Sequence, residues 1–233
     1  MSVPYFYEPQ IAAGMTQFTL SETSSKHCIQ VLRMEAGDLI DITNGQGGLF
    51  HATIQVANKK NAIVQITESI QDPIPAQQLH LGISLLKNAV RLEWLFEKAT
   101  EMGVTKITPL ICERTIHERF KTDRMQQIIQ SAMIQSQQTW LPVLEEPTPF
   151  DRFIEKANAT QQLIAHCEPT DKTSIKAILP SNNLLLLIGP EGDFSPIEIK
   201  TAIAKNFEPI QLGPTRLRTE TAGIFALSVL KNF

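Results

Sequence analysis

The chain has 233 residues, enough for one large domain or two modest ones with a substantial buried core. Its 21 Lys and Arg residues against 24 Asp and Glu residues give a formal net charge of −3, so no basic arm or tail marks it as a nucleic-acid-binding protein. The longest apolar run, residues 184–188, is far too short to cross a bilayer, and the N-terminal residues lack the basic and apolar regions of a secretory signal, so neither membrane insertion nor secretion is expected.

Residues 1–72 are predicted to form a small β-rich domain. Clusters of apolar and β-branched residues predict strands at 18–20, 38–43, 48–56 and 62–66. The glycine-rich turn signal at 44–48 predicts a hairpin between two of them. A helix is expected over 22–34, with Ser21 as its N-cap. Its apolar residues, Cys28, Val31 and Leu32, are expected to share one face. Lys26, Gln30 and Arg33 are then more exposed.

Residues 73–233 show a different pattern, in which strands alternate with helices. The prolines in 71–75 break regular structure and indicate a linker before this second domain. The expected strands are 80–86, 107–111, 163–166, 184–188 and 209–212, and the expected helices are 90–102, 122–138, a helix from 196 onward, and 219–230. Gly103 suits a helix C-cap, and Ser195, Pro196 and Glu198 form a capping-box start. This alternation predicts an α/β fold with a parallel sheet covered by helices on both faces.

Two of these strands end in glycine-containing loops that lead into helices. The strand 184–188 runs into Gly189-Pro190-Glu191-Gly192, and the strand 209–212 runs into a loop that begins with Gly213. Neither loop has the spacing of a dinucleotide fingerprint or a P-loop. Each alone is as well explained by an ordinary strand-to-helix turn. Two together predict a ligand crevice at the carboxyl edge of the sheet.

Charged residues near these strand ends are candidates for binding. Arg216 and Arg218 flank Leu217, and in an extended segment both would project to one side, which suits phosphate or carboxylate recognition. A solvated pair that bridges to acids is an equally good interpretation. Glu220 opens the last helix, where a carboxylate can simply complement the helix dipole.

A metal site is not expected. His166, Cys167 and Glu168 are metal-ligand types at a strand end, but consecutive residues of an extended chain point apart. The cysteines are three in number and lack CxxC spacing, so neither a zinc site nor a disulfide framework is predicted. Few cysteines without pairing are typical of a reducing cytoplasm.

The sequences of these two loops, together with further segments of the chain, resemble those of a known family. The segments GPEGDF at 189–194 and LGPTRLRTETA at 212–222 are similar to the signature of the RsmE-type uridine-N3 methyltransferases of small-subunit ribosomal RNA, within the SPOUT class. His27 with 31–33 and 37–38, the segment 98–103, the segment 109–114 and Gln135-Ser136 match the family in the same order. The resemblance therefore covers nearly the whole chain.

The resemblance implies a PUA-like RNA-binding β-barrel over 1–72 and a SPOUT methyltransferase domain over 73–233 with a deep C-terminal trefoil knot. It further implies a cytoplasmic homodimer that binds S-adenosyl-L-methionine and acts on 16S ribosomal RNA in the small ribosomal subunit, without a metal. The residues expected to hold this cofactor are Ile188, Gly189, Pro190, Glu191, Gly192, Leu212, Gly213, Leu217, Arg218, His166, Cys167 and Glu168. Those expected to contact RNA are Arg33, Lys87, Arg114 and Arg216.

The chemistry expected at this site is methylation of a uridine N3, an imide nitrogen that must first lose its proton. Arg218 is the candidate for stabilising the negative charge that develops on the base, and Glu191 or Glu220 is the candidate base. One alternative stays open, because the residues at 2–7 and at 131–138 depart from the family pattern. The chain could be a non-catalytic RNA-binding dimer whose α/β domain serves only for docking.

Overall fold

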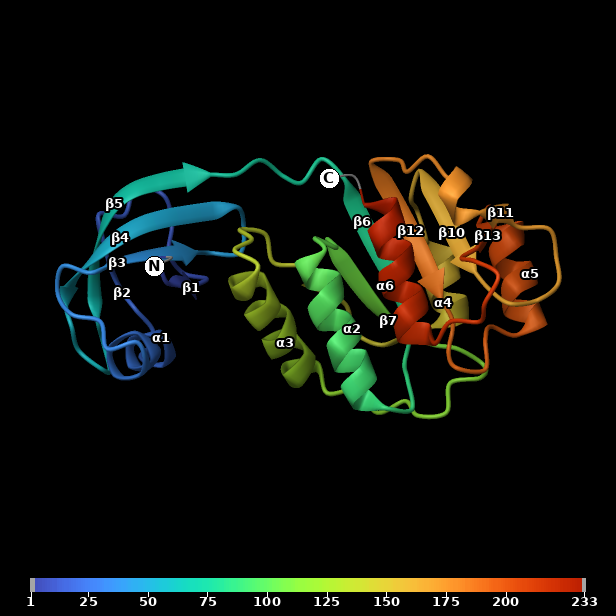
Figure 1. Cartoon of the computed structure of the whole chain (residues 1–233), viewed down its shortest axis with the longest axis horizontal. Helices are drawn as coiled ribbons and strands as arrows, with labels where there is room; N and C mark the ends of the chain where they lie inside the picture. Colours follow the sequence, from blue (N-terminus) through green and yellow to red (C-terminus); the bar gives the residue numbers. More distant parts are fainter. Residues whose placement is uncertain (1–2, 232–233) are drawn as a thin grey trace. The chain divides into compact units, whose positions relative to one another are not determined.

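The computed structural model describes residues 3–231, which divide into two compact units (Figure 1). The first unit holds the residues up to 74 and also 133–141, and the second holds 75–132 and the residues from 142 onward. The segment 133–141, which the sequence led us to place in the second domain, belongs to the first unit because its backbone bonds there. The Gly47 N–H donates to the Thr139 carbonyl at 2.8 Å, and the Leu141 N–H donates to the Gly45 carbonyl at 2.9 Å.

The first unit is built on a five-stranded sheet with the order β1-β3-β4-β5-β2. Its strands are β1 (Tyr5–Tyr7), β2 (Gln17–Thr19), β3 (Leu39–Thr43), β4 (Gly48–Val56) and β5 (Ile63–Gln71). β1 and β3 are parallel, and the other pairs are antiparallel. The predicted hairpin is confirmed between β3 and β4, where Gly45 and Gly47 have φ angles of 71° and 85°. In the described residues the expected barrel is a curled sheet whose edges are β1 and β2.

The predicted helix over 22–34 is confirmed only at its start. Ser21 caps α1 (Glu22–Lys26), and its hydroxyl accepts from the Ser24 N–H. A π-helical turn over His27–Val31 follows. This turn changes the helical period, so the predicted apolar face does not form. Cys28 is fully buried, whereas Val31 and Leu32 are 63% and 42% exposed.

The second unit is built on a parallel sheet with the order β11-β13-β10-β12-β6-β7-β8, and β9 also pairs with β7. Its strands are β6 (Gln78–Ser84), β7 (Lys106–Ile111), β8 (Val143–Leu144), β9 (Thr148–Pro149), β10 (Gln161–Ala165), β11 (Thr173–Ser174), β12 (Asn183–Ile188) and β13 (Glu208–Gln211). Every described pair in this sheet is parallel. The predicted α/β fold with a parallel sheet is therefore confirmed.

Helices lie on both faces of this sheet, with α6 in front of it and α4 behind it in Figure 1. The helices after α1 are α2 (Ala89–Glu101), α3 (Thr122–Gln135), α4 (Phe150–Lys156), α5 (Pro196–Ala204) and α6 (Thr219–Leu230). Leu185 and Leu187 of β12 pack in one core with residues of α4 and α5. Leu184 and Leu186, which alternate with them, are also fully buried. The four leucines thus form a central strand with both faces covered.

Helix ends follow the sequence signals. Gly103 has a φ of 75° at the end of α2, and Ser195 and Glu198 form the predicted capping box at the start of α5. α4 was not predicted, although its buried residues Phe150, Phe153 and Ile154 have helical spacing. No helix within residues 3–231 is long and apolar enough to span a bilayer.

Candidate functional site

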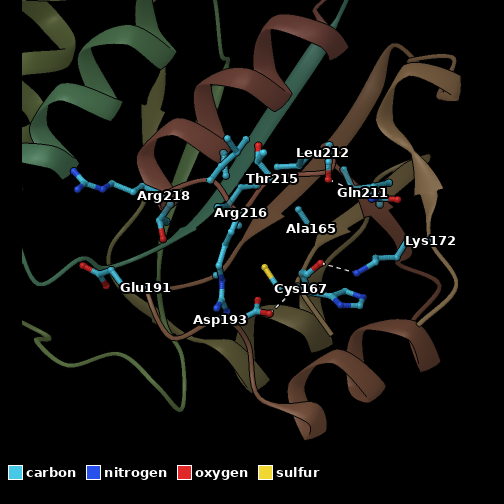
Figure 2. Close-up of a pocket in the computed structure, with 18 of the residues that line it drawn as sticks. Ala165, Cys167, Lys172, Glu191, Asp193, Gln211, Leu212, Thr215, Arg216 and Arg218 are labelled. Carbon is cyan, nitrogen blue, oxygen red and sulfur yellow. Dashed lines mark hydrogen bonds between the residues drawn. The ribbon is translucent and has the colours of Figure 1, made fainter. Parts of the chain in front are cut away.

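A cleft of about 740 Å³ opens at the carboxyl edge of the parallel sheet (Figure 2). Its walls are the loops that follow β10, β12 and β13, three strands whose carboxyl ends lie side by side in the sheet. Parallel strands bring such loops together at one edge, which is where α/β proteins bind ligands. The predicted crevice between the loops after β12 and β13 is therefore present.

Most of the residues expected to hold a cofactor line this cleft. Those that do are Ile188, Gly189, Pro190, Glu191, Leu212, Gly213, Leu217, Arg218, His166 and Cys167. Gly192, Glu168 and Glu220 are not among its lining residues. Sequence reasoning missed Lys172, Asp193, Gln211, Thr215 and Thr219, and it assigned Arg216, which also lines the cleft, to RNA only.

The loop after β12 turns too sharply for a side chain at its first position. A Cβ on Gly189 would lie 2.9 Å from the backbone nitrogen of Phe194. The Asp193 N–H donates to the Pro190 carbonyl at 2.9 Å and closes the turn. Gly189 is thus required by the fold of the loop, and this turn shapes one wall of the cleft.

His166 is the most unusual side chain of the cleft. It is only 7% exposed, and neither of its ring nitrogens has a hydrogen-bond partner within residues 3–231. Burial and, next, the charge of Lys172 hold the pKa of the imidazole below its ordinary value. The ring is therefore neutral at neutral pH, with one donor and one acceptor available to a molecule in the cleft.

The sequence led us to expect that the two arginines of the loop after β13 project to one side. In the structure they do not. In Figure 2 the Arg216 side chain runs across the cleft toward Asp193, whereas the Arg218 side chain points the other way, on the side of Glu191. The rule that alternate residues share a side holds for strands, and β13 already ends at Gln211. The two cations therefore serve different parts of the cleft.

The two candidate carboxylates differ in their surroundings. Glu191 lines the cleft, and its Oε1 accepts from the backbone N–H of Lys87 at 3.1 Å. Glu220 is buried, with Oε1 3.6 Å from Nε of Arg91 on α2, and its Oε2 has no hydrogen-bond partner among the described residues. Of the two, Glu191 is the one placed at the cleft.

The other residues predicted to contact RNA lie in different places. Arg114 lies next to the loop after β12, and its guanidinium donates to the carbonyl oxygens of Gly192 at 2.8 Å and Phe194 at 3.4 Å. The Lys87 side chain is exposed in the loop between β6 and α2. Arg33 is an exposed residue of the first unit, in the left-handed conformation with a φ of 58°.

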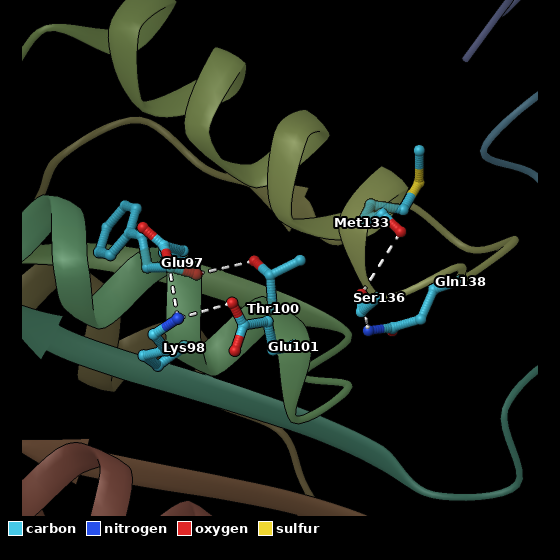
Figure 3. Close-up of polar contacts among 8 residues, drawn as sticks. Glu97, Lys98, Thr100, Glu101, Met133, Ser136 and Gln138 are labelled. Atoms are coloured by element: carbon cyan, nitrogen blue, oxygen red, sulfur yellow. Dashed lines mark hydrogen bonds and ion pairs between the residues drawn. The ribbon is translucent and has the colours of Figure 1, made fainter. Parts of the chain in front are cut away.

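Two further segments of the family resemblance hold internal polar contacts (Figure 3). On α2, the Lys98 ammonium lies 2.7 Å from a carboxylate oxygen of both Glu97 and Glu101. In the first unit, the Gln138 amide donates to the Ser136 hydroxyl at 2.8 Å. Within residues 3–231, no group of three or more His, Cys, Asp or Glu side chains is placed to hold a metal ion.

The fold and the cleft define a class of protein: an α/β domain with a ligand cleft at the carboxyl ends of parallel strands, joined to a small β-rich unit. A family profile described as an RNA methyltransferase domain matches residues 73–231, and one described as an RNA methyltransferase PUA domain matches residues 20–67. The chain belongs to this RNA methyltransferase family.

Named relatives match most of the chain. The chain is 34% identical over 218 residues to a Synechocystis protein named ribosomal RNA small subunit methyltransferase E, with 88% of this chain and 70% of that protein covered. A probable rRNA methyltransferase from Porphyromonas gingivalis is 34% identical with a TM-score of 0.90, over 97% of this chain and 96% of its own. A putative methyltransferase from Legionella pneumophila, solved with bound cofactor SAM, is 33% identical with a TM-score of 0.88, over 99% and 97%.

Proposed function

We propose that this protein is an S-adenosylmethionine-dependent methyltransferase that methylates N3 of a specific uridine in the 16S ribosomal RNA of the small subunit, in the cytoplasm. Membership of the RNA methyltransferase family supports the reaction class. The name of the Synechocystis relative supports the small-subunit substrate, and the Legionella structure supports the cofactor. The observation that carries the proposal is the cleft at the strand ends, with the unpaired His166 inside it.

His166 gives a test of whether the cleft suits this cofactor. Each buried polar atom left without a partner costs about 1–3 kcal/mol, so the two ring nitrogens call for a ligand that pairs with them. S-adenosylmethionine has hydroxyl groups that donate and accept, an amino group that donates and a carboxylate that accepts. The volume of about 740 Å³ lies within the usual range for ligand sites. The residues present therefore fit the cofactor.

The roles of the cleft residues follow from the chemistry of the uridine imide. S-adenosylmethionine supplies an electrophilic methyl group carried on a sulfonium. The uridine N3–H must lose its proton before N3 can accept that methyl group, and we assign the proton to the Glu191 carboxylate. The Lys87 N–H fixes one oxygen of this carboxylate. Arg218, on the same side of the cleft, favours the anionic base electrostatically.

A homodimer is part of the proposal. Val90 and Trp94 lie one turn apart on α2 and are 70% and 43% exposed, so together they form an apolar surface on this helix. A second copy of the chain would cover them. Light scattering should give the mass of a dimer for the native protein and of a monomer for Trp94→Glu. A native protein that is monomeric at micromolar concentration would contradict the dimer.

The reaction is tested by incubating small ribosomal subunits with the protein and methyl-labelled S-adenosylmethionine, followed by digestion to nucleosides. N3-methyluridine is the expected product, whereas a label on carbon 5 or on a ribose would refute the position. Arg218→Ala should lower the rate by about 100-fold, the usual loss for one transition-state donor. Arg152→Ala, which removes an exposed cation of α4 outside the cleft, is the matched control and should leave the rate unchanged.

A further inference from the structure

Asp193 occupies a backbone conformation that normally favours glycine. It closes the turn after β12 with a φ of 66°, in the left-handed region that L-residues adopt at a cost. The neighbouring residue, Gly192, is a glycine, but the left-handed position itself holds an aspartate with a side chain. A strained residue that lines a cleft calls for a function of its side chain.

The Asp193 carboxylate joins two loops that lie far apart in the sequence. Its Oδ2 accepts from the Cys167 N–H at 2.7 Å (Figure 2). Its Oδ1 accepts from the Phe194 N–H at 2.9 Å. Cys167 belongs to the loop after β10, and Asp193 belongs to the loop after β12. The paired register of these two strands ends at Ala165 and Ile188. The carboxylate therefore continues the link between the strands beyond the point where their own pairing stops.

This link bears directly on the walls of the cleft. His166, with its two unpaired ring nitrogens, precedes Cys167 in the loop that Asp193 holds. Hydrogen bonds to a charged acceptor are shorter and stronger than those between neutral groups. A loop held this way keeps the imidazole in one place before a ligand arrives, which lowers the cost of ordering on binding.

We propose that Asp193 is a positioning residue that fixes the His166–Cys167 segment against the loop after β12 and thereby sets the affinity of the cleft for S-adenosylmethionine. The inference rests on the proposed function, since it assumes that this cofactor occupies the cleft. Asp193 lines the cleft, acts on the position of His166 through its bond to Cys167, and takes no part in proton transfer.

Four proteins test the proposal by calorimetric titration with S-adenosylmethionine. Asp193→Gly removes the link and the backbone strain together, so its melting temperature should stay within about 3 °C of the native value while its affinity falls about tenfold. Asp193→Asn tolerates the left-handed conformation and keeps one acceptor oxygen but loses the charge, so its affinity should lie between those of Asp193→Gly and the native protein. Asn206→Gly is the matched control, because Asn206 has a φ of 65° but lies outside the cleft. It should bind as the native protein does.

Hydrogen exchange gives a readout that is independent of the cofactor. The Cys167 amide should exchange at least about tenfold faster in Asp193→Gly than in the native protein, because its acceptor is gone. Native affinity in Asp193→Gly, or an unchanged Cys167 amide, would overturn the role of Asp193. A native protein that gives no heat with S-adenosylmethionine would overturn the proposed function instead, so the two failures are distinguishable.

Discussion

His80 should make the second unit less stable in mild acid. It lies near the start of β6, and its Nε2 is 2.7 Å from the Thr108 hydroxyl. That hydroxyl donates its only proton to Glu145, so Nε2 must carry a proton and donate it to Thr108. Burial and, next, the charge of Lys106 lower the pKa of His80 from 6.5 to about 4.

The sign and size of the effect follow from these two pKa values. Between pH 6.5 and 4 the unfolded chain binds a proton at His80 that the folded chain does not bind, so stability is fully present above pH 6.5 and is lost as the pH falls. At pH 5 the loss amounts to about 2 kcal/mol. His80→Gln carries no such proton and should lack this part of the pH dependence.

Urea unfolding between pH 5 and 7.5 measures this difference. All proteins in this experiment carry Trp140→Phe, so that Trp94 is the remaining tryptophan. Trp94 belongs to the same unit as His80, and its fluorescence therefore reports the unfolding of that unit. His117→Gln is the control, because His117 is exposed. If the native and His80→Gln proteins lose stability in parallel from pH 7 to 5, the reasoning on the buried imidazole is wrong.

Three further predictions concern helix α5 and the loops after β12 and β13. Glu198→Ala should destabilise the second unit by about 2–4 kcal/mol, because the carboxylate accepts from the Ser195 N–H and from one N–H of the loop after β7, and thermal unfolding should show it. Gly189→Ala should cost about 1–3 kcal/mol, since the added Cβ meets the Phe194 nitrogen at 2.9 Å, and should weaken titration with S-adenosylmethionine. Gly213→Ala should unfold at the native temperature, because no atom lies within 4 Å of its Cβ position, and a large loss there would contradict the steric argument.

The α/β part of the fold could be predicted because its signals are local. The capping box at Ser195 and the glycine cap at Gly103 mark helix ends through contacts within a few residues. The first unit was harder, because a π-helical turn interrupts the period on which the burial of Val31 and Leu32 was predicted. The hydrogen bonds of a π-helical turn span five residues where those of an α-helix span four, and the composition of the segment does not indicate this change.

The site could be predicted as far as the strand ends, and no further. Parallel strands place their carboxyl ends at one edge, so the loops that begin at Gly189 and Gly213 were expected to meet. Lys172 and Asp193 were missed because their positions depend on the path of the loops and not on any strand. The directions of Arg216 and Arg218 were wrong for the same reason, since the rule for strands was applied beyond the end of β13.

The loop after β12 contacts each neighbouring loop through a separate residue. Glu191 accepts from an N–H of the loop after β6, the Gly192 carbonyl accepts from a guanidinium of the loop after β7, and Asp193 accepts from an N–H of the loop after β10. β12 lies between β10 and β6 in the sheet, so its loop is central at the carboxyl edge. Three consecutive residues of one turn therefore couple three loops, and a change at any of them alters the cleft through its neighbours. Lys87 and Arg114, which the sequence predicts to contact RNA, each donate a hydrogen bond to this turn, Lys87 through its backbone N–H and Arg114 through its guanidinium.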